Sequence, residues 1–476
     1  MRCHCLSARI GAGLAAALLA LVLVACGESA LLAGVGSGGT GIAEGAISGF
    51  GSVIVDGVEY DDSVAASRAE DATGASVAAE LKLGQRVRVF RSADGSAERI
   101  EVLAQLIGPV TRTLADGELR VLDQRVRIVT DSGLQDTATV LDGHAGVGAI
   151  THGDTLEVHG VWAADSAGGP PVLVASRIEK RGAVTDWLLS GVVSARVGSV
   201  FTLNQSAVRV QVPDDLASVT APGAFVRFWT AAGVWPAPVL VATRAADGRP
   251  QPREGEPLRL SVQTSGADVR DGVLSVQGLS LRISAALAAW LPAQRAQVML
   301  EALADAQGLS VISVGTRTDP AQQGGEILLK GAIVWQPGAA SIRLRQTVVA
   351  GTDLPGVTDP ACPRVATAEP VFVEIRARRA PPGQLPQAIT VTCRPELPAD
   401  GVIRRPATLL ARASDLGSLT VLFGESATTL VLTAASLLPP ELEQLLRDRA
   451  PVEVEYQQVD GRRLLRQIRP PPPPPF

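Results

Sequence analysis

Residues 452–456 read Val452-Glu453-Val454-Glu455-Tyr456, with an apolar side chain at every second position. Side chains on a β-strand point alternately to the two faces of the sheet, so this stretch predicts a strand with one buried face. The same alternation occurs in Val208–Val212 and in Ile342–Arg345. We therefore expect half-buried strands along much of the chain.

The segments around this strand predict a five-stranded barrel. Three strands are expected before it, at Thr408–Ala411, Leu419–Phe423 and Thr429–Leu432, and one after it, at Leu464–Ile468. Residues 439–449 lie between the third and fourth strands, with prolines and acids at their start and arginines at their end, which is typical of a short helix. The order strand-strand-strand-helix-strand-strand is that of an OB-type barrel. SH3-like barrels and five-stranded sandwiches remain open as alternatives.

The same order recurs about six times from Gly45 onward, with a second short helix expected at Ser284–Arg295. The dipeptides Asp56-Gly57 and Asp271-Gly272 tolerate positive φ and predict tight hairpin turns. The fold class that we expect is therefore all-β: tandem small five-stranded OB-like barrels with an occasional short helix between strands three and four. The predicted division is a signal peptide at 1–25, a Gly-rich tether at 26–44, barrels at 45–105, 106–182, 183–250, 251–320, 321–398 and 399–469, and a polyproline tail at 470–476.

The amino-acid composition limits the classes of partner that the protein can bind. The 476 residues are 46% hydrophobic, which is enough to build large cores. Lys and Arg number 43 against 48 Asp and Glu, for a net charge of −5. Proteins that bind nucleic acid need a basic surface to displace counterions from phosphates, so the charge argues against a nucleic-acid partner.

The N-terminus predicts a lipid anchor. Arg2 and Arg9 precede an uncharged apolar run, Ile10–Ala25, that is too short for a comfortable membrane span and suits a signal peptide. Its end, Leu23-Val24-Ala25-Cys26-Gly27, resembles the lipobox of bacterial lipoproteins. The resemblance implies that Cys26 is acylated and becomes the first residue of the mature chain. Glycine after the cysteine then implies the outer membrane, facing the periplasm or the cell surface. An ordinary secretory peptide with a chance cysteine is the alternative.

The cysteine count predicts one disulfide. Of five cysteines, Cys3 and Cys5 leave with the signal peptide and Cys26 carries the lipid. Cys362 and Cys393 remain as an even pair in an oxidising compartment, so we expect them to be bonded. Metal binding by these two thiolates is less favoured, because no third or fourth ligand lies nearby in the sequence.

The first repeat carries a family motif, Gly49-Phe50-Gly51-Ser52-Val53-Ile54-Val55-Asp56-Gly57-Val58-Glu59-Tyr60-Asp61, preceded by Ser37-Gly38-Gly39-Thr40-Gly41. It resembles an uncharacterised domain family that occurs in tandem in proteobacterial lipoproteins and secreted proteins. The match is specific over 37–104 and weaker over 108–182. The resemblance implies a β-barrel and supplies no substrate, cofactor or catalytic residue. The motif also has a structural explanation: Phe50 packs, and the glycines permit a bulge or a close approach.

The sequence shows no recognisable catalytic motif. After signal removal the histidines are His144, His152 and His159, whose spacing fits no common metal-ligand pattern. Nucleophile-elbow, metalloprotease and P-loop motifs are absent. The acid pairs Asp61-Asp62 and Asp214-Asp215 are expected in turns. We therefore predict no metal, no cofactor and no catalytic residue.

Aromatic residues supply the candidate binding site. Phe225 and Trp229 are expected to share one face of a strand in the third repeat, where a core role is the default, and Trp235 lies in a loop before Pro236. Trp235 is the best candidate for ligand contact, with Trp229 and Phe225 as weaker ones. OB barrels bind sugars and single strands by stacking on aromatic rings, and an envelope address favours glycans or proteins as ligands.

The six prolines Pro470–Pro475 precede Phe476 and favour polyproline II, because the ring restricts φ and removes the N–H donor. This tail is expected to be a spacer, or alternatively a ligand for a partner.

Together these features predict a lipid-anchored cell-envelope binding or scaffold protein that is not an enzyme. The alternatives are an envelope glycan-acting enzyme with an unrecognised acid pair, or an assembly or adhesion protein.

Overall fold

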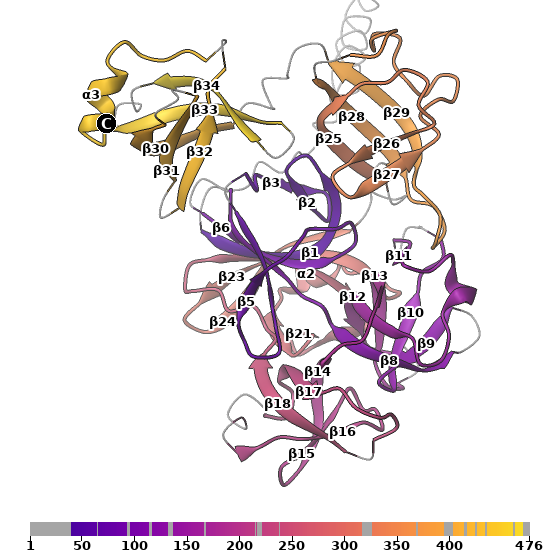
Figure 1. Ribbon diagram of the computed structural model, residues 1–476. Coiled ribbons are helices and arrows are strands. Elements are labelled where there is room, and N and C mark those ends of the chain that lie inside the picture. Colours follow the sequence, from indigo (N-terminus) through magenta and orange to yellow (C-terminus); the bar gives the residue numbers. More distant parts are fainter. Residues whose placement is uncertain are drawn as a thin grey trace, which may run out of the picture. The chain divides into compact units, whose positions relative to one another are not determined.

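A computed structural model (Figure 1) describes residues 40–469. The residues left out within this range are 64, 93–95, 114–116, 132–136, 166–167, 215, 217–220, 238, 317–325, 368–369, 395–402, 414–416, 424–425, 434–435 and 460–461. The predicted signal peptide, Cys26 and the polyproline tail lie outside the described residues. Within them, nearly all regular structure is β-strand, which confirms the all-β class.

The strands fall into repeating groups, which we call units one to six. Unit one contains β1 (Gly41–Phe50), β2 (Val53–Val55), β3 (Val58–Tyr60), β4 (Ala66–Glu70), β5 (Ser76–Ala78), β6 (Arg86–Arg91) and β7 (Ala97–Val102). Unit two contains β8 (Leu106–Thr113), β9 (Glu118–Val121), β10 (Gln124–Ile128), β11 (Val140–Asp142), β12 (Thr155–Ala163) and β13 (Val172–Arg181). Unit three contains β14 (Asp186–Val197), β15 (Val200–Leu203), β16 (Arg209–Gln211), β17 (Phe225–Ala231) and β18 (Leu240–Asp247).

The remaining units follow the same plan. Unit four contains β19 (Pro257–Thr264), β20 (Val269–Arg270), β21 (Val273–Val276), β22 (Leu279–Arg282), helix α2 (Ala285–Ala288), β23 (Ala296–Asp305) and β24 (Gly308–Thr316). Unit five contains β25 (Glu326–Val334), β26 (Ser341–Leu344), β27 (Thr347–Ala350), β28 (Pro370–Arg378) and β29 (Gln387–Arg394). Unit six contains β30 (Ile403–Arg412), β31 (Ser418–Phe423), β32 (Ser426–Val431), helix α3 (Leu442–Arg447), β33 (Pro451–Val459) and β34 (Arg462–Arg469).

One pairing order recurs in units two to six, whereas in unit one the parallel partner of the last strand, β7, is β4 rather than β3. In unit six the strands close into a barrel in the order β30-β31-β32-β34-β33, with β32 and β34 parallel and the other neighbours antiparallel. Unit two closes in the same way through β8-β9-β10-β13-β12, and unit three through β14-β15-β16-β18-β17. In unit four the first strand is split between β19 and β20, and in unit five the described residues show no ladder between β25 and β26. Parallel pairing of strands three and five is the strand order that the OB interpretation predicts.

Both α-helices of the described chain lie between strands three and four, as predicted, but each is shorter than its predicted stretch. Helix α2 starts after Ser284, whose hydroxyl accepts a hydrogen bond from the backbone N–H of Leu287. Helix α3 buries Leu442 against the sixth core. The predicted turns are also present: Asp56 and Gly57 have φ of 46° and 84°, the left-handed pair that a two-residue hairpin requires.

The first strands of different units pair with one another, which the sequence did not predict. β1 forms parallel ladders with β19 (Ile42↔Leu258) and with β25 (Phe50↔Leu329), and β8 pairs antiparallel with β14 (Leu189↔Leu106). β1 therefore begins at Gly41, inside the stretch predicted as tether, because its first residues pair with β6 and β19. These ladders pair the parts of the first strands that have only one partner strand within their own unit, so that their second edge is not left open to aggregation.

The cores follow this pairing rather than the order of the units along the chain. Units two and three share one apolar cluster, from Leu106 to Ala242. Units one and five share another, in which Phe50 and Ile375 are both buried. Unit four has its own cluster, joined by Ile42 of β1, and unit six has a separate one. Sharing lets small units bury more apolar surface than each could alone.

The Gly-Phe-Gly-Ser motif lies at the junction of units one and five. A Cβ atom on Gly49 would lie 2.3 Å from the carbonyl oxygen of Leu328, and one on Gly51 would lie 2.9 Å from Cβ of Lys330. Phe50, between them, packs in the shared core. The glycines are therefore required by the close approach of β25 to β1.

Replacing Gly49 with alanine is expected to lower the free energy of unfolding by about 1–3 kcal/mol, because the backbone of β25 must move to make room. Urea unfolding measures the change. Gly182→Ala is the matched control, since its Cβ would meet nothing within 4 Å. Equal stability of the two variants would contradict the close packing of β1 against β25.

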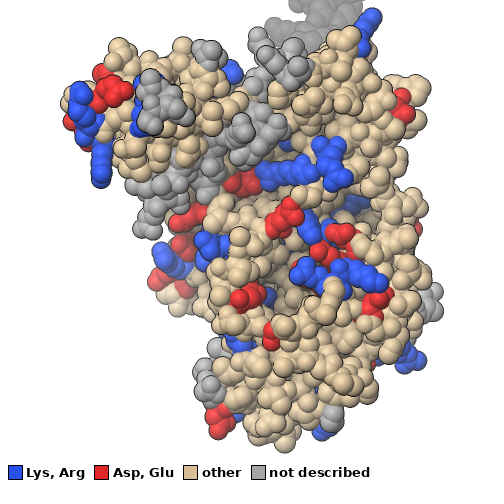
Figure 2. All heavy atoms as spheres, in the orientation of Figure 1, with Lys and Arg blue, Asp and Glu red and all other residues tan. Residues whose placement is uncertain are grey.

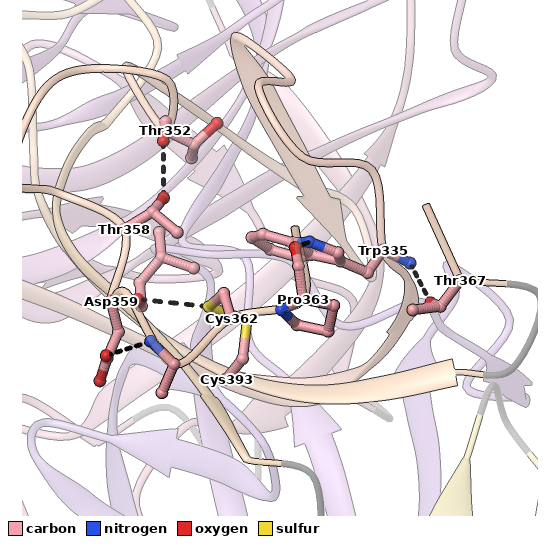
Figure 3. The surroundings of a disulfide bond; sticks show 10 residues. Trp335, Thr352, Thr358, Asp359, Cys362, Pro363, Thr367 and Cys393 are labelled. Atoms are coloured by element: carbon pink, nitrogen blue, oxygen red, sulfur yellow. Dashed lines mark hydrogen bonds between the residues drawn. A yellow bond between two sulfur atoms is a disulfide. The ribbon is translucent and has the colours of Figure 1, made fainter. Parts of the chain in front are cut away.

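The predicted disulfide is present. Cys362 and Cys393 are bonded, and both are buried in the core shared by units one and five (Figure 3). Cys393 lies on β29, and Cys362 lies in the segment between β27 and β28, the position that a helix occupies in units four and six. Trp335 covers the same region and donates from Nε1 to the carbonyl oxygen of Pro363 at 2.7 Å. In unit five a covalent bond thus holds the segment that a helix fills elsewhere.

Candidate functional site

A cavity of about 320 Å³ lies where units two and three meet. Its lining comes from the start of unit two, from a turn before β12, from the connection between the units, and from the loop after β17. The lining residues are Pro109, Val110, His152, Gly153, Thr155, Ala183, Val184, Trp187, Ala232, Gly233 and Trp235. The volume lies within the range of small-molecule sites, roughly 300–1,000 Å³.

Two tryptophans form one corner of this cavity. Trp187 lies on β14, opposite Thr230 of β17, and is 5% exposed. Trp235 lies in the loop between β17 and β18 and is half-buried. Their ring centroids are 6.2 Å apart and their planes meet at 71°, an edge-to-face contact. The loop is fixed at its start, because the N–H of Ala232 donates to the carbonyl oxygen of Thr185 at 2.8 Å.

His152 stands on a turn that is held firmly against β8. The N–H of Gly153 donates to the carbonyl oxygen of Val110, and the N–H of Val110 donates to that of Asp154. The carboxylate of Asp154 accepts from Lys180, Thr151 and His144. The hydrogen bond from Lys180 is the largest influence, and together these donors hold the pKa of Asp154 far below its ordinary value. Asp154 therefore acts as a fixed anion that stabilises the turn.

The electrostatic character of the cavity is neutral. Its lining includes no Asp, Glu, Lys or Arg, and its polar side chains are those of His152, Thr155 and the two indoles. Next to it, Val234 is 88% exposed. Such a surface suits an uncharged ligand with flat apolar faces, and offers nothing to neutralise phosphate groups.

The other predicted aromatic residues lie in the interior. Phe225 is buried in the core shared by units two and three. Trp229 is buried between the guanidinium groups of Arg227 and Arg244, whose carbon atoms lie 4.7 and 4.3 Å from the ring centroid. Of the three aromatic candidates, Trp235 alone lines the cavity. Its ring partner Trp187 was missed, because a tryptophan at the start of an apolar strand is by default a core residue and only the fold brings the two rings together.

The three histidines do not converge on one point. His144 contacts Asp154 at 3.3 Å, and His159, which is fully buried, contacts Glu157 at 2.9 Å, while His152 lines the cavity. Burial would raise the pKa of Glu157, but the hydrogen bond and charge of His159, with Arg181 and Arg177, lower it to about 2. Over the described residues, no three His, Cys, Asp or Glu side chains are grouped so as to hold a metal ion.

Of the two acid pairs expected in turns, Asp61-Asp62 has structural partners. Asp61 accepts from the backbone N–H of Ser63, and Asp62 pairs with Arg345 at 3.1 Å, whereas Asp215 is outside the described residues. Acidic and basic side chains stand next to one another on the face drawn in Figure 2. The described carboxyl groups that have a shifted pKa, Glu44, Asp71, Asp154, Glu157, Glu179, Asp247, Asp268 and Asp305, all have it lowered.

Comparison with known proteins adds no relative. No protein-family model matches the chain, and no curated protein matches it either. The site is therefore interpreted from its own geometry.

Proposed function

We propose that this chain is a lipid-anchored protein of the bacterial cell envelope, whose tandem OB-like units form a scaffold and bind a ligand in the cavity between units two and three. The observation that carries the binding role is the pair Trp187 and Trp235, which meet edge to face in an uncharged cavity. Aromatic side chains at the surface of an OB barrel are the usual contacts of this fold with its ligands.

The cavity lining contains no Asp or Glu, which favours binding over glycan hydrolysis as the function of this site. A glycosidase needs one carboxyl group that keeps its proton, with a raised pKa, near a second carboxylate. The shifted acids of the described residues instead have the character of permanent anions that hold turns and arginines. A neutral aromatic cavity fits recognition without bond cleavage.

The cavity can be tested in the envelope itself. A photo-crosslinking amino acid at Gly233, whose Cβ would point into free space, is expected to form an adduct with the occupant of the cavity, whether an envelope component or another protein segment. The same group at Gly266, an exposed residue of unit four that does not line the cavity and whose Cβ would also meet nothing within 4 Å, is the control, and Trp235→Ala should abolish the adduct. Equal adducts from both positions, or none from Gly233, would overturn the binding role.

The anchor rests on the sequence around Cys26. Three acyl chains hold a protein firmly, whereas one myristoyl chain gives only marginal binding. No helix in the part of the chain that the structure describes is long and apolar enough to span a bilayer.

Replacing Cys26 with serine is expected to move the protein from the membrane fraction to the soluble or unprocessed fraction. Fractionation of envelopes followed by immunoblotting measures this, with Ser29→Ala as the control that leaves the lipobox intact. A Cys26→Ser variant that still fractionates with membranes would rule out the anchor.

A further inference from the structure

The cavity between units two and three offers two kinds of contact. The indoles of Trp187 and Trp235 present flat apolar surfaces at a corner, lined further by Pro109 and Val110. Within the part of the chain that the structure describes, neither indole Nε1 donates a hydrogen bond to another residue. The site therefore suits a ligand with stiff apolar rings and carbonyl acceptors.

Proline in the polyproline II conformation has this chemistry. Its rings form apolar ridges, its carbonyl groups point outward, and it has no N–H of its own. Grooves lined by aromatic residues bind such segments because the conformation is already fixed, so little entropy is lost on binding. Indole N–H groups are suitable donors to the free carbonyls.

The chain supplies such a segment itself. Pro470–Pro475 and Phe476 follow directly after β34, which ends at Arg469. Six prolines in polyproline II span about 19 Å, two turns of three residues. Neither the segment nor the cavity lining contains an Asp, Glu, Lys or Arg, so no charged side chain of either has to be desolvated within the contact. The geometry points to Pro470–Phe476 as the occupant of the Trp187–Trp235 cavity.

This inference deepens the proposed function and rests on it, since it names the ligand class of the same cavity. A neutral sugar is the competing ligand, but it would need several polar side chains to fix its hydroxyl groups, and the lining provides His152 and Thr155 besides the indoles. Trp290, which is 69% exposed on unit four, is aromatic but does not line the cavity and so serves as the comparison.

The test uses the mature chain ended after Arg469 and a fluorescent peptide with the sequence of Arg469–Phe476. Saturable binding by fluorescence anisotropy is expected. Trp235→Ala should weaken it at least about tenfold, because truncation of a central aromatic contact has effects of this size. Gly233→Arg should weaken it as well, and Trp290→Ala should not. A peptide with every second proline replaced by glycine should bind more weakly, because its conformation is no longer fixed.

The chain with its tail intact identifies the source of the occupant. It should bind the peptide more weakly than the shortened chain, because its own segment competes. Competition that is independent of protein concentration supports the segment of the same molecule, whereas competition that grows with concentration would place the segment of a second copy in the cavity and overturn the assignment to the same molecule.

No binding to the shortened chain, or equal binding by Trp235→Ala, would overturn it. If the peptide fails to bind while the crosslink at Gly233 still forms, or while a neutral chito-oligosaccharide binds in a manner that Trp235→Ala abolishes, the proline proposal falls and the binding role stands. If the crosslink does not form and neither the peptide nor the oligosaccharide binds, the proline proposal and the binding role are both overturned.

Discussion

Replacing Glu44 with alanine is expected to lower the free energy of unfolding by about 3–5 kcal/mol, the usual result of removing one partner from a buried ion pair. Glu44 lies on β1 where this strand pairs with β19, and Arg86 beside it is only 2% exposed. Oε1 accepts from Arg86 at 2.7 and 3.0 Å, and Oε2 accepts from Arg88 at 2.9 and 3.0 Å. Without the carboxylate, two poorly hydrated guanidinium groups would face each other at the junction of units one and four.

Urea unfolding measures the loss, and Glu59→Ala is the control. Glu59 pairs with Lys330 at 3.2 Å but is largely solvated, so its replacement should change stability by no more than about 1 kcal/mol. The double variant Glu44→Ala/Arg86→Met should recover part of the stability, because it removes one of the uncompensated charges. If Glu44→Ala behaves like Glu59→Ala, the charges at this junction are solvated.

The pH dependence of the same variant has a definite sign. Burial would raise the pKa of Glu44, but the charges and hydrogen bonds of Arg88 and Arg86 outweigh burial and lower it below its ordinary value of 4.5. The contribution of a group with a lowered folded pKa is complete above the unfolded value and is lost as the pH falls through the folded one. The difference between the wild type and Glu44→Ala should therefore be constant from neutral pH down to about 5 and shrink at more acidic pH.

Loss of the Cys362–Cys393 bond is the second large effect. The double variant Cys362→Ala/Cys393→Ala is expected to lose about 3–4 kcal/mol, since the bond closes a loop with a sequence separation of 31. The segment around Cys362 has no helix to hold it, and it contacts β29 through the N–H of Asp359, which donates to the carbonyl oxygen of Val391. Because units one and five share a core, hydrogen exchange should rise in β1–β3 as well as in β25–β29.

Reduction provides the matched experiment. Dithiothreitol should destabilise the wild type by the same amount and leave the double variant unchanged, with melting followed by circular dichroism. Unchanged melting of the wild type after complete reduction would contradict a structural role of the bond.

The local sequence pattern was sufficient to predict the strands and turns within the units. The alternation in Val452–Tyr456 predicted β33 (Pro451–Val459), and Asp56-Gly57 predicted a left-handed turn, because both properties depend on a residue and its immediate neighbours. The helix predicted at 439–449 is present as α3, Leu442–Arg447. The stretch Ser284–Arg295 became only the four-residue α2, because the chain turns at Trp290 and Leu291 to bury the latter against the fourth core.

The hydrophobic pattern of the sequence did not predict which units pair with one another. Ladders such as those of β1 with β19 and with β25 are formed by backbone groups, which nearly all residues share. Side-chain identity therefore does not predict which first strands pair. The Gly-Phe-Gly-Ser motif gave a partial indication, since its glycines were expected to permit a bulge or a close approach, but it did not reveal that Leu328 approaches Gly49.

The candidate site divides in the same way. The sequence singled out Trp235 from its place before a proline in a loop, and it identified the two cysteines that bond. Tertiary structure alone decided that Trp187 is the ring partner of Trp235, that Trp229 lies between two arginines, and that Arg86 and Arg88 share one carboxylate. The physical reason is range: periodicity and turn chemistry act over a few residues, whereas a cavity or a buried ion pair forms only when strands far apart along the chain come into register.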